Sequence, residues 1–191
     1  MKRWLLFSLI LCTILLCCAG CAKEPAPFDS AAAAAPVSAF PLIRLGKLSL
    51  TAPEGFTAGD DGKSWYAPKY PSDGSCITLH TADTLPPFAS YTADKVKQAL
   101  ESSYKDTLGT AVTVTMDAFT FTAVSGFDAL RLQYHFTYRD IKINCLQYLI
   151  GADKAYTVTC MQVADAKWMT QYDTVCTDLY FTWELLMPLA A

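Results

Sequence analysis

The cysteines have the most reactive side chains in this chain, because a thiol can form a disulfide, bind a metal or carry a lipid. Four of the eight cysteines lie within the first 21 residues, and the other four are Cys76, Cys145, Cys160 and Cys176. None of the second group belongs to a C-x-x-C pair, and the two histidines are far apart in sequence. Ligand spacing therefore predicts no metal site, whereas an even number of cysteines permits disulfides.

The two histidines are the first residues to consider for catalysis. His135 falls on the polar side of an alternating segment, beside Arg131 and Gln133, and His80 ends a shorter segment. A catalytic histidine needs a positioned nucleophile or acid, and the chain contains neither a G-x-S-x-G nor an H-E-x-x-H motif. We predict that both histidines are ordinary strand residues, that no cofactor is bound and that the protein is not an enzyme; a hydrolase is the minor alternative.

The N-terminal residues have the layout of a secretory signal peptide. Lys2 and Arg3 precede an apolar run, and small residues lead up to Cys21, which predicts cleavage between Gly20 and Cys21. A transmembrane helix would need about 20 apolar residues, whereas Trp4–Ala19 supplies 16. Cleavage is therefore favoured over an uncleaved anchor, and secretion without an anchor is a third alternative.

The residues before Cys21 resemble the lipobox of bacterial lipoproteins, although Cys18 occupies a position where leucine is preferred. This resemblance implies that Cys21 carries diacylglycerol and usually a third acyl chain, such as palmitate. Two or three chains would hold the protein stably on a membrane. The implied location is the outer face of the bacterial cytoplasmic membrane, or the outer membrane if the host has two.

The charge of the remaining chain excludes one class of partner. Without residues 1–20, which contain two basic residues, 13 basic residues remain against 18 acidic ones, a net charge of −5. A chain this acidic, without a basic cluster, is not typical of nucleic-acid-binding proteins. Electrostatic attraction to an anionic membrane is equally unfavourable, so attachment would depend on the lipid.

The composition divides the rest of the chain into two parts. Residues 21–39 contain Pro25, Pro27, Pro36 and a short alanine run, which is too short for an isolated helix and predicts a disordered, partly extended tether. Residues 40–191 then form one domain of about 150 residues, enough for a single core.

Alternating and helical periodicities predict the elements of this domain. Helices are expected from Thr92, as N-cap, to about Lys105, and again from Asp165 onward. Strands are expected at residues 46–51, 65–66, 76–80, 111–123, 130–138, from 141 and from 155. Short connections at Arg139-Asp140 and at residues 151–154 predict hairpins. The fold class is therefore α+β, with a largely antiparallel sheet flanked by helices.

The second hairpin leads to a prediction about the cysteines. Pairing Ile150 with Ala155 places Cys145 opposite Cys160, at about 4.5–5.5 Å between Cα atoms, which a disulfide tolerates. The alternative is two buried free thiols, because free cysteine is often buried. Cys76 and Cys176 could also meet if the last helix crosses the strand that begins near Cys76.

The domain resembles the PsbP family, named after an extrinsic subunit of photosystem II, within a superfamily of αβα sandwiches that includes many bacterial lipoproteins. The resemblance is clearest at Ser125–Leu132 and extends to Ala52–Phe56, Cys76–Leu79, Gln147-Tyr148 and Ala155–Thr159. It implies an αβα sandwich and a non-enzymatic assembly, adaptor or binding role. No binding residue of the family maps onto this chain.

Two aromatic segments are candidates for a binding surface. One contains Trp65, Tyr66 and Tyr70, which could alternatively fill the core beside Phe56. The other is the apolar run from Phe181 to Leu189, with Trp183 and Met187. The sequence therefore predicts a lipid-anchored, non-catalytic module that binds or assembles an envelope protein. The alternative is binding of a small ligand in a pocket between sheet and helix.

Overall fold

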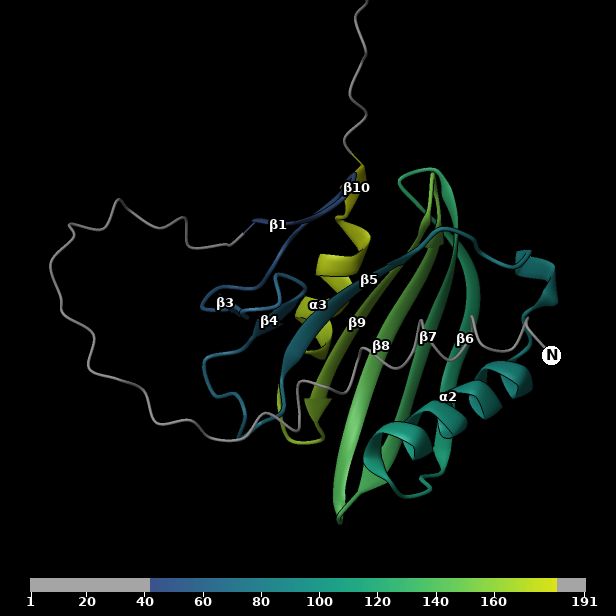
Figure 1. Cartoon of the computed structure of the whole chain (residues 1–191). Helices are drawn as coiled ribbons and strands as arrows, with labels where there is room; N and C mark the ends of the chain where they lie inside the picture. The colour runs from purple at the N-terminus through teal and green to yellow at the C-terminus, as the bar shows by residue number, and fades with distance from the viewer. Residues whose placement is uncertain (1–41, 182–191) are drawn as a thin grey trace, which may run out of the picture.

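The computed structural model describes residues 42–181 of the chain. The predicted cleavage site at Gly20, the predicted lipid attachment at Cys21, the predicted tether, and Trp183 and Met187 lie outside the described residues. The described residues form 13 elements of secondary structure: five strands, two helices, four strands, a helix and a last strand, in chain order (Figure 1).

A seven-stranded sheet forms the centre of the domain, and all of its neighbouring strands are antiparallel. Its β7–β8 and β8–β9 pairs are the two predicted hairpins, and β6 and β7 form a third hairpin that was not predicted. Its strands, in spatial order, are β3 (Thr57–Ala58), β4 (Ser64–Tyr66), β5 (Cys76–Ala82), β9 (Ala155–Val163), β8 (Ile141–Gly151), β7 (Phe127–Tyr138) and β6 (Val114–Val124).

A second sheet contains β1 (Leu42–Leu45), β2 (Leu48–Thr51) and β10 (Tyr180–Phe181), with β2 in the middle. The single strand predicted over residues 46–51 begins two residues too early, because β2 starts at Leu48. Gly46 has φ of 59°, in the left-handed region that favours glycine, and turns the chain from β1 into β2. Neither β1 nor β10 was predicted, and the predicted last helix was expected to be the final element.

Two helices cover the large sheet. α2 (Ala93–Leu108) begins as predicted, because the Thr92 hydroxyl accepts a hydrogen bond from the Lys95 N–H at 3.3 Å. It ends at Gly109, which is left-handed, one turn beyond the predicted end. α3 (Met169–Thr177) begins after Trp168 and not at Asp165. A short 3-10 helix, η2 (Phe88–Ser90), precedes α2.

The large sheet separates two hydrophobic cores, with α2 on one face and α3 on the other (Figure 1). The α2 core includes Leu100, Tyr104, Tyr134, Phe136, Cys145 and Met161. The α3 core also takes in the small sheet and includes Leu48, Leu50, Trp65, Cys160, Tyr172 and Cys176. The α+β sandwich predicted from the sequence is thereby confirmed.

The two hairpins differ in how well their register was predicted. Tyr138 pairs with Ile141 as expected, and Arg139 and Asp140 have the positive φ values of a two-residue turn, 49° and 63°. In the next hairpin, however, Gly151 pairs with Ala155, so the loop has three residues instead of four. The whole β8–β9 pairing is therefore shifted by one residue.

This shift overturns the predicted Cys145–Cys160 disulfide. Cys145 pairs with Met161, and Cys160 pairs with Leu146. A shift of one residue turns a side chain to the other face of a sheet, so Cys145 lies in the α2 core and Cys160 in the α3 core. The second predicted pairing is not formed either, because Cys76 belongs to the α2 core and Cys176 to the α3 core. None of the four cysteines among the described residues is in a disulfide in the structure.

Candidate functional site

Tyr66 and Tyr70 form a stacked aromatic pair at one end of the large sheet. Their ring centroids are 4.3 Å apart, with 29° between the ring planes, and both side chains are partly exposed. Trp65 points to the opposite face, because side chains alternate along β4, and is only 6% exposed in the α3 core. Trp65 is therefore a core residue, and of the predicted surface only the two tyrosines, which pack against the α2 core, are partly exposed.

The loop that carries Tyr70 is held by main-chain hydrogen bonds. The Ala67 N–H donates to the Ser75 carbonyl at 3.0 Å, and the Gly74 N–H donates to the Pro71 carbonyl at 3.1 Å. The Val163 N–H donates to the Asp73 carbonyl at 2.9 Å, which ties the loop to the end of β9. The tyrosine pair is thus presented by an ordered turn.

A second aromatic group lies at the opposite edge of the sheet and was not predicted. We call it the edge cluster: Phe88, Tyr91, Phe119 and Phe121. Phe121 makes edge-to-face contacts with Phe119 and Phe88, at centroid distances of 5.4 and 6.4 Å, and Phe88 packs near Tyr91 at 6.1 Å. Phe121 is nevertheless 52% exposed. The alternation of Phe119 and Phe121 with threonines is the sequence signal that could have indicated it.

β6, which carries Phe119 and Phe121 of the edge cluster, has no strand neighbour on one side among the described residues. Among the described residues β6 pairs only with β7, so one row of its main-chain N–H and C=O groups has no strand partner. The register shifts between Met116 and Ala118, which places a bulge at Asp117. Beyond the bulge, Ala118–Val124 pairs regularly with β7 and contains no charged residue, proline or glycine. Charged residues and prolines usually protect an edge strand from pairing with another chain, and this segment has neither.

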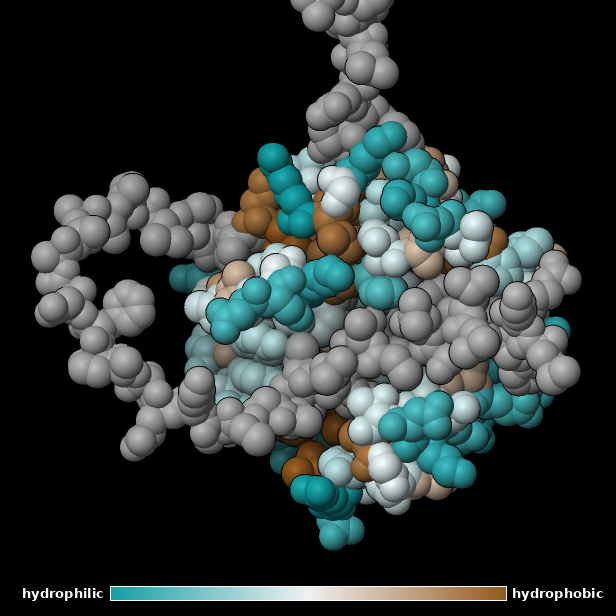
Figure 2. All heavy atoms as spheres, viewed as in Figure 1, coloured by the Kyte–Doolittle hydropathy of each residue, from teal (hydrophilic) through white to brown (hydrophobic). Residues whose placement is uncertain are grey.

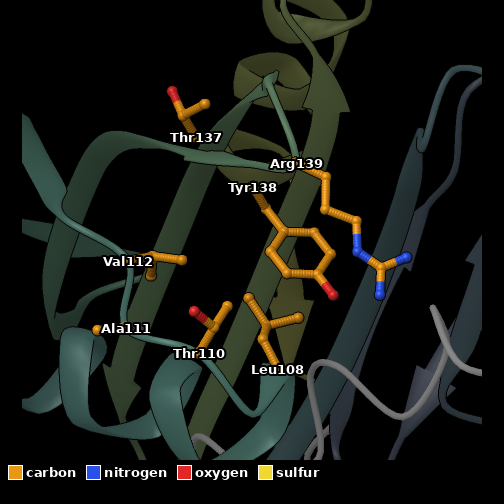
Figure 3. A pocket seen from close by; sticks show the side chains of 7 residues that line it. All are labelled: Leu108, Thr110, Ala111, Val112, Thr137, Tyr138 and Arg139. Carbon is orange, nitrogen blue, oxygen red and sulfur yellow. The ribbon is translucent and has the colours of Figure 1, made fainter.

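A pocket of about 400 Å³ lies at the hairpin end of the molecule, between the chain after α2 and the end of β7 (Figure 3). It is lined by Leu108, Thr110, Ala111, Val112, Thr137, Tyr138 and Arg139. The Arg139 guanidinium lies 5.0 Å from the centre of the Tyr138 ring. Arg139 is the one charged residue of this lining, so the pocket suits a small ligand with a negative group more than it suits acid–base chemistry.

The pocket lies beside Leu108, the last residue of α2, and does not extend along the helix. The interface between α2 and the sheet is filled: Leu100 and Tyr104 are buried, and the Tyr104 and Phe136 rings are 4.2 Å apart.

Hydrophobic side chains are also exposed elsewhere on the surface. Seen from the side drawn in Figure 1, they gather near β1 and at the β7–β8 hairpin (Figure 2). The exposed residues in those regions include Leu42, Tyr180 and Ile141.

Buried tyrosines link α2 to the sheet. The Tyr104 and Tyr134 hydroxyls are 3.0 Å apart, and the Tyr134 hydroxyl donates to Gln147 Oε1 at 3.3 Å. Burial raises the pKa of both tyrosines well above the ordinary value, and Cys145 raises both further by a smaller amount. Both phenols are therefore neutral hydrogen-bonding groups that position the helix.

His135 forms its side-chain hydrogen bond with a carboxylate. His135 Nδ1 lies 2.8 Å from Asp117 Oδ2, at the bulge of β6. Among the described residues, no hydroxyl or thiol forms a hydrogen bond with His135. His80 lies within β5, where burial and, to a smaller extent, Lys63 lower its pKa. Both are strand residues, as predicted.

Residues 42–181 contain no group of three or more side chains that could hold a metal ion. None of their helices has the length and apolar character needed to cross a membrane.

Comparison with known proteins identifies the fold. No protein-family model and no curated protein matches the chain. The solution structure of cyanobacterial PsbP (CyanoP) from Synechocystis sp. PCC 6803 superposes with a TM-score of 0.57 at 13% identity, covering 79% of this chain and 98% of CyanoP. The chain therefore has the PsbP-like fold predicted from its residues.

Two further structures are similar at lower TM-scores. A protein of unknown function from Pseudomonas aeruginosa, described as a putative regulator, gives 0.48 at 14% identity, covering 76% of this chain and 99% of that one. LpqN of Mycobacterium tuberculosis, described as involved in cell envelope biogenesis, gives 0.46 at 15% identity, covering 71% of this chain and 83% of LpqN.

Proposed function

We propose that this protein is a bacterial lipoprotein whose PsbP-like domain binds another protein at the outer side of a membrane, without catalysis. The observation that carries the proposal is the open edge of β6 over Ala118–Val124. An uncharged edge strand of this kind is prone to pair with another chain.

The geometry of β6 favours an extended segment of the partner as the group that is bound. A strand added to an edge is held by main-chain hydrogen bonds, and side-chain pockets give it specificity. Phe121, at 52% exposure, and the partly buried Phe119 and Phe88 offer an apolar contact beside that edge. The bulge at Asp117 limits regular pairing to the seven residues that follow it.

The membrane attachment in this proposal comes from the N-terminal pattern. Diacylglycerol on Cys21 would hold the domain on the membrane through the residues between Cys21 and β1. Its test is fractionation of cells that express the full chain or its Cys21→Ala variant. We expect the unchanged chain in the membrane fraction with an acyl-modified N-terminal peptide, and the variant uncleaved or released. An unmodified chain with the same distribution as the variant would contradict lipidation.

Partner binding is tested by photo-crosslinking in intact cells. A photoreactive residue at Thr122, which is exposed on β6, should give a discrete adduct, whereas one at Asp106, exposed on α2, should not. Phe121→Lys should abolish the adduct by charging the edge. Ile141→Lys is a matched control, because Ile141 is also 52% exposed. Equal adducts from both positions, or an adduct that survives Phe121→Lys, would contradict the role of the edge.

The pocket supports a second candidate function, binding of a small anionic ligand. Arg139 would contact the negative group, and Tyr138 and Leu108 would contact an apolar part. A thermal-shift screen of carboxylates and phosphates tests this function. A stabilising ligand should lose its effect in Arg139→Ala and keep it in Arg44→Ala, since Arg44 is an exposed arginine on β1.

A further inference from the structure

Two cysteines from different elements contact each other in the α3 core. The Sγ atoms of Cys160, on β9, and Cys176, on α3, are 3.9 Å apart. Both side chains are fully buried, and 16 residues separate them in the chain. Neither the spacing of the cysteines nor the expected hairpin register predicts this pair.

The topology excludes the other pairings of the four cysteines. Cys76 and Cys145 both pair with Met161 from opposite sides of β9. They are therefore two strand spacings apart, about 9–10 Å, which exceeds the roughly 7 Å between Cα atoms that a disulfide spans. Both also face the α2 core, so the sheet separates them from Cys160 and Cys176.

Other contacts already fix α3 against β9 beside the two thiols. The Tyr172 hydroxyl donates to the Met161 carbonyl at 3.0 Å, and the Trp168 N–H donates to Gln162 Oε1 at 2.9 Å. The three contact residues of the α3 segment, Trp168, Tyr172 and Cys176, are four apart and so lie along one side of the helix. They meet three consecutive residues of β9. The position of Cys176 over Cys160 is therefore set by a row of contacts.

We propose that Cys160 and Cys176 form a disulfide that fastens α3 to the sheet once the protein has left the cytoplasm. This inference rests on the export of the chain in the proposed function, because disulfides persist in oxidising compartments. Closing the bond brings the sulfurs to about 2.05 Å, through side-chain rotation and a small approach of α3. Cys76 and Cys145 stay reduced.

The oxidation is a thiol–disulfide exchange with an external disulfide. The two thiols lose two protons and two electrons and form one S–S bond, while the external disulfide takes up both and becomes two thiols. The attacking group is a thiolate, and burial raises the pKa of Cys160 well above its ordinary value. The exchange therefore takes place during folding, before the core closes, and the finished bond is shielded from reductants.

Peptide mapping tests the pairing directly, because trypsin places the four cysteines in four different peptides. The full chain is isolated from membranes, free thiols are alkylated under denaturing conditions, and the protein is digested without reduction. We expect peptide 155–167 linked to peptide 168–191, about 2 Da lighter than their sum, with Cys76 and Cys145 alkylated. A second sample is reduced, denatured and refolded with glutathione disulfide.

Comparison of the two samples distinguishes an error in the proposed cysteine pairing from an error in the proposed place of oxidation. Four alkylated cysteines in both samples, or a link through Cys76 or Cys145, would overturn the proposed pairing. A Cys160–Cys176 link after refolding, with free thiols in the membrane sample, would overturn oxidation in the cell and argue against export.

The variants Cys160→Ala and Cys145→Ala provide matched controls, since both residues are fully buried in neighbouring strands. Reduction of the unfolded protein, followed by refolding in reductant, should lower the Tm of the unchanged protein and of Cys145→Ala by about 5–10 °C. It should leave the Tm of Cys160→Ala unchanged. An equal response of the two variants would overturn the pairing.

Discussion

Arg131 of β7 and Asp173 of α3 form an ion pair that connects the helix to the sheet. The Arg131 Nε and Nη2 groups both donate to Asp173 Oδ1, at 3.1 and 2.9 Å, and the Tyr148 hydroxyl donates to the same oxygen at 3.4 Å. The sequence placed Arg131 on the polar side of its strand, but it could not show that this side faces a helix. The pair is thus a polar contact at the margin of the α3 core.

The first prediction concerns this ion pair. Arg131→Met should lower the free energy of unfolding by about 1 kcal/mol, a modest loss because the Asp173 side chain is 47% exposed and water screens the pair. Asp173→Asn, which keeps an acceptor oxygen, should cost less. Urea unfolding followed by tryptophan fluorescence measures both. An unchanged midpoint for Arg131→Met would show that the pair does not stabilise the docking of α3.

The second prediction concerns the buried tyrosines of the α2 core. Tyr134→Phe removes the hydroxyl that lies between Tyr104 and Gln147, so two buried polar groups lose a partner. We expect a loss of about 1–3 kcal/mol. Tyr104→Phe leaves the bond between Tyr134 and Gln147 in place and should cost less. In a double-mutant cycle the two losses should not add, because both changes break the same bond; additive losses would count against the network.

The third prediction concerns a buried hydroxyl on β9. Thr159 is fully buried, and its Oγ1 has no hydrogen-bond partner among the described residues. Thr78 of β5, which pairs with Thr159 and is 6% exposed, also has an Oγ1 without a partner among them. Thr159→Val replaces the hydroxyl with a methyl group of similar size and should raise stability by about 1 kcal/mol. Thr159→Ala, which leaves a cavity, should lower it. Destabilisation by both variants would indicate that the hydroxyl has a polar partner.

The fourth prediction concerns pH. Burial, and to a smaller extent Lys63, lower the pKa of His80 in the folded protein. The folded state therefore binds a proton less readily than the unfolded state, whose histidine titrates near 6.5. The stability linked to His80 is present above that pH and is lost as the pH falls through 6.5 toward the folded pKa.

Urea midpoints at pH 7.5 and 5.0 measure this effect. The difference between the two midpoints should shrink in His80→Gln. His135→Gln is the matched control, because it retains His80 and the fall that His80 causes. An unchanged difference in His80→Gln would assign the pH dependence to other groups.

Periodicity predicted those parts of the fold in which one face of a segment differs clearly from the other. The alternation of Leu130, Leu132, Tyr134 and Phe136 identified the buried face of β7, and Thr92 identified the start of α2. The β8–β9 register was missed because Gly151 fits both a three-residue and a four-residue loop. Along β9 both faces are buried, so the hydrophobic pattern does not distinguish the two registers.

The candidate sites depend on contacts between distant parts of the chain, and local sequence patterns do not reveal these contacts. Trp65 and Tyr66 are adjacent aromatics, and only the presence of a second core explains why Trp65 is buried. The edge cluster depends on the order of strands in the sheet, which places β6 at an edge and brings Phe88 beside Phe121. The contact between Cys160 and Cys176 depends on how α3 crosses β9. The spacing of residues in the sequence predicts none of these contacts.

The position of β9 between β5 and β8 determines when the domain can be completed during synthesis. Ribosomes deliver the chain from its N-terminus, so β3, β4 and β5 emerge long before residues 155–163. Until then β5 lacks the neighbour that pairs with all seven of its residues, Cys76–Ala82, and closing so long an intervening segment is entropically costly. The first half of the domain therefore has to wait, incompletely folded, for nearly the last strand.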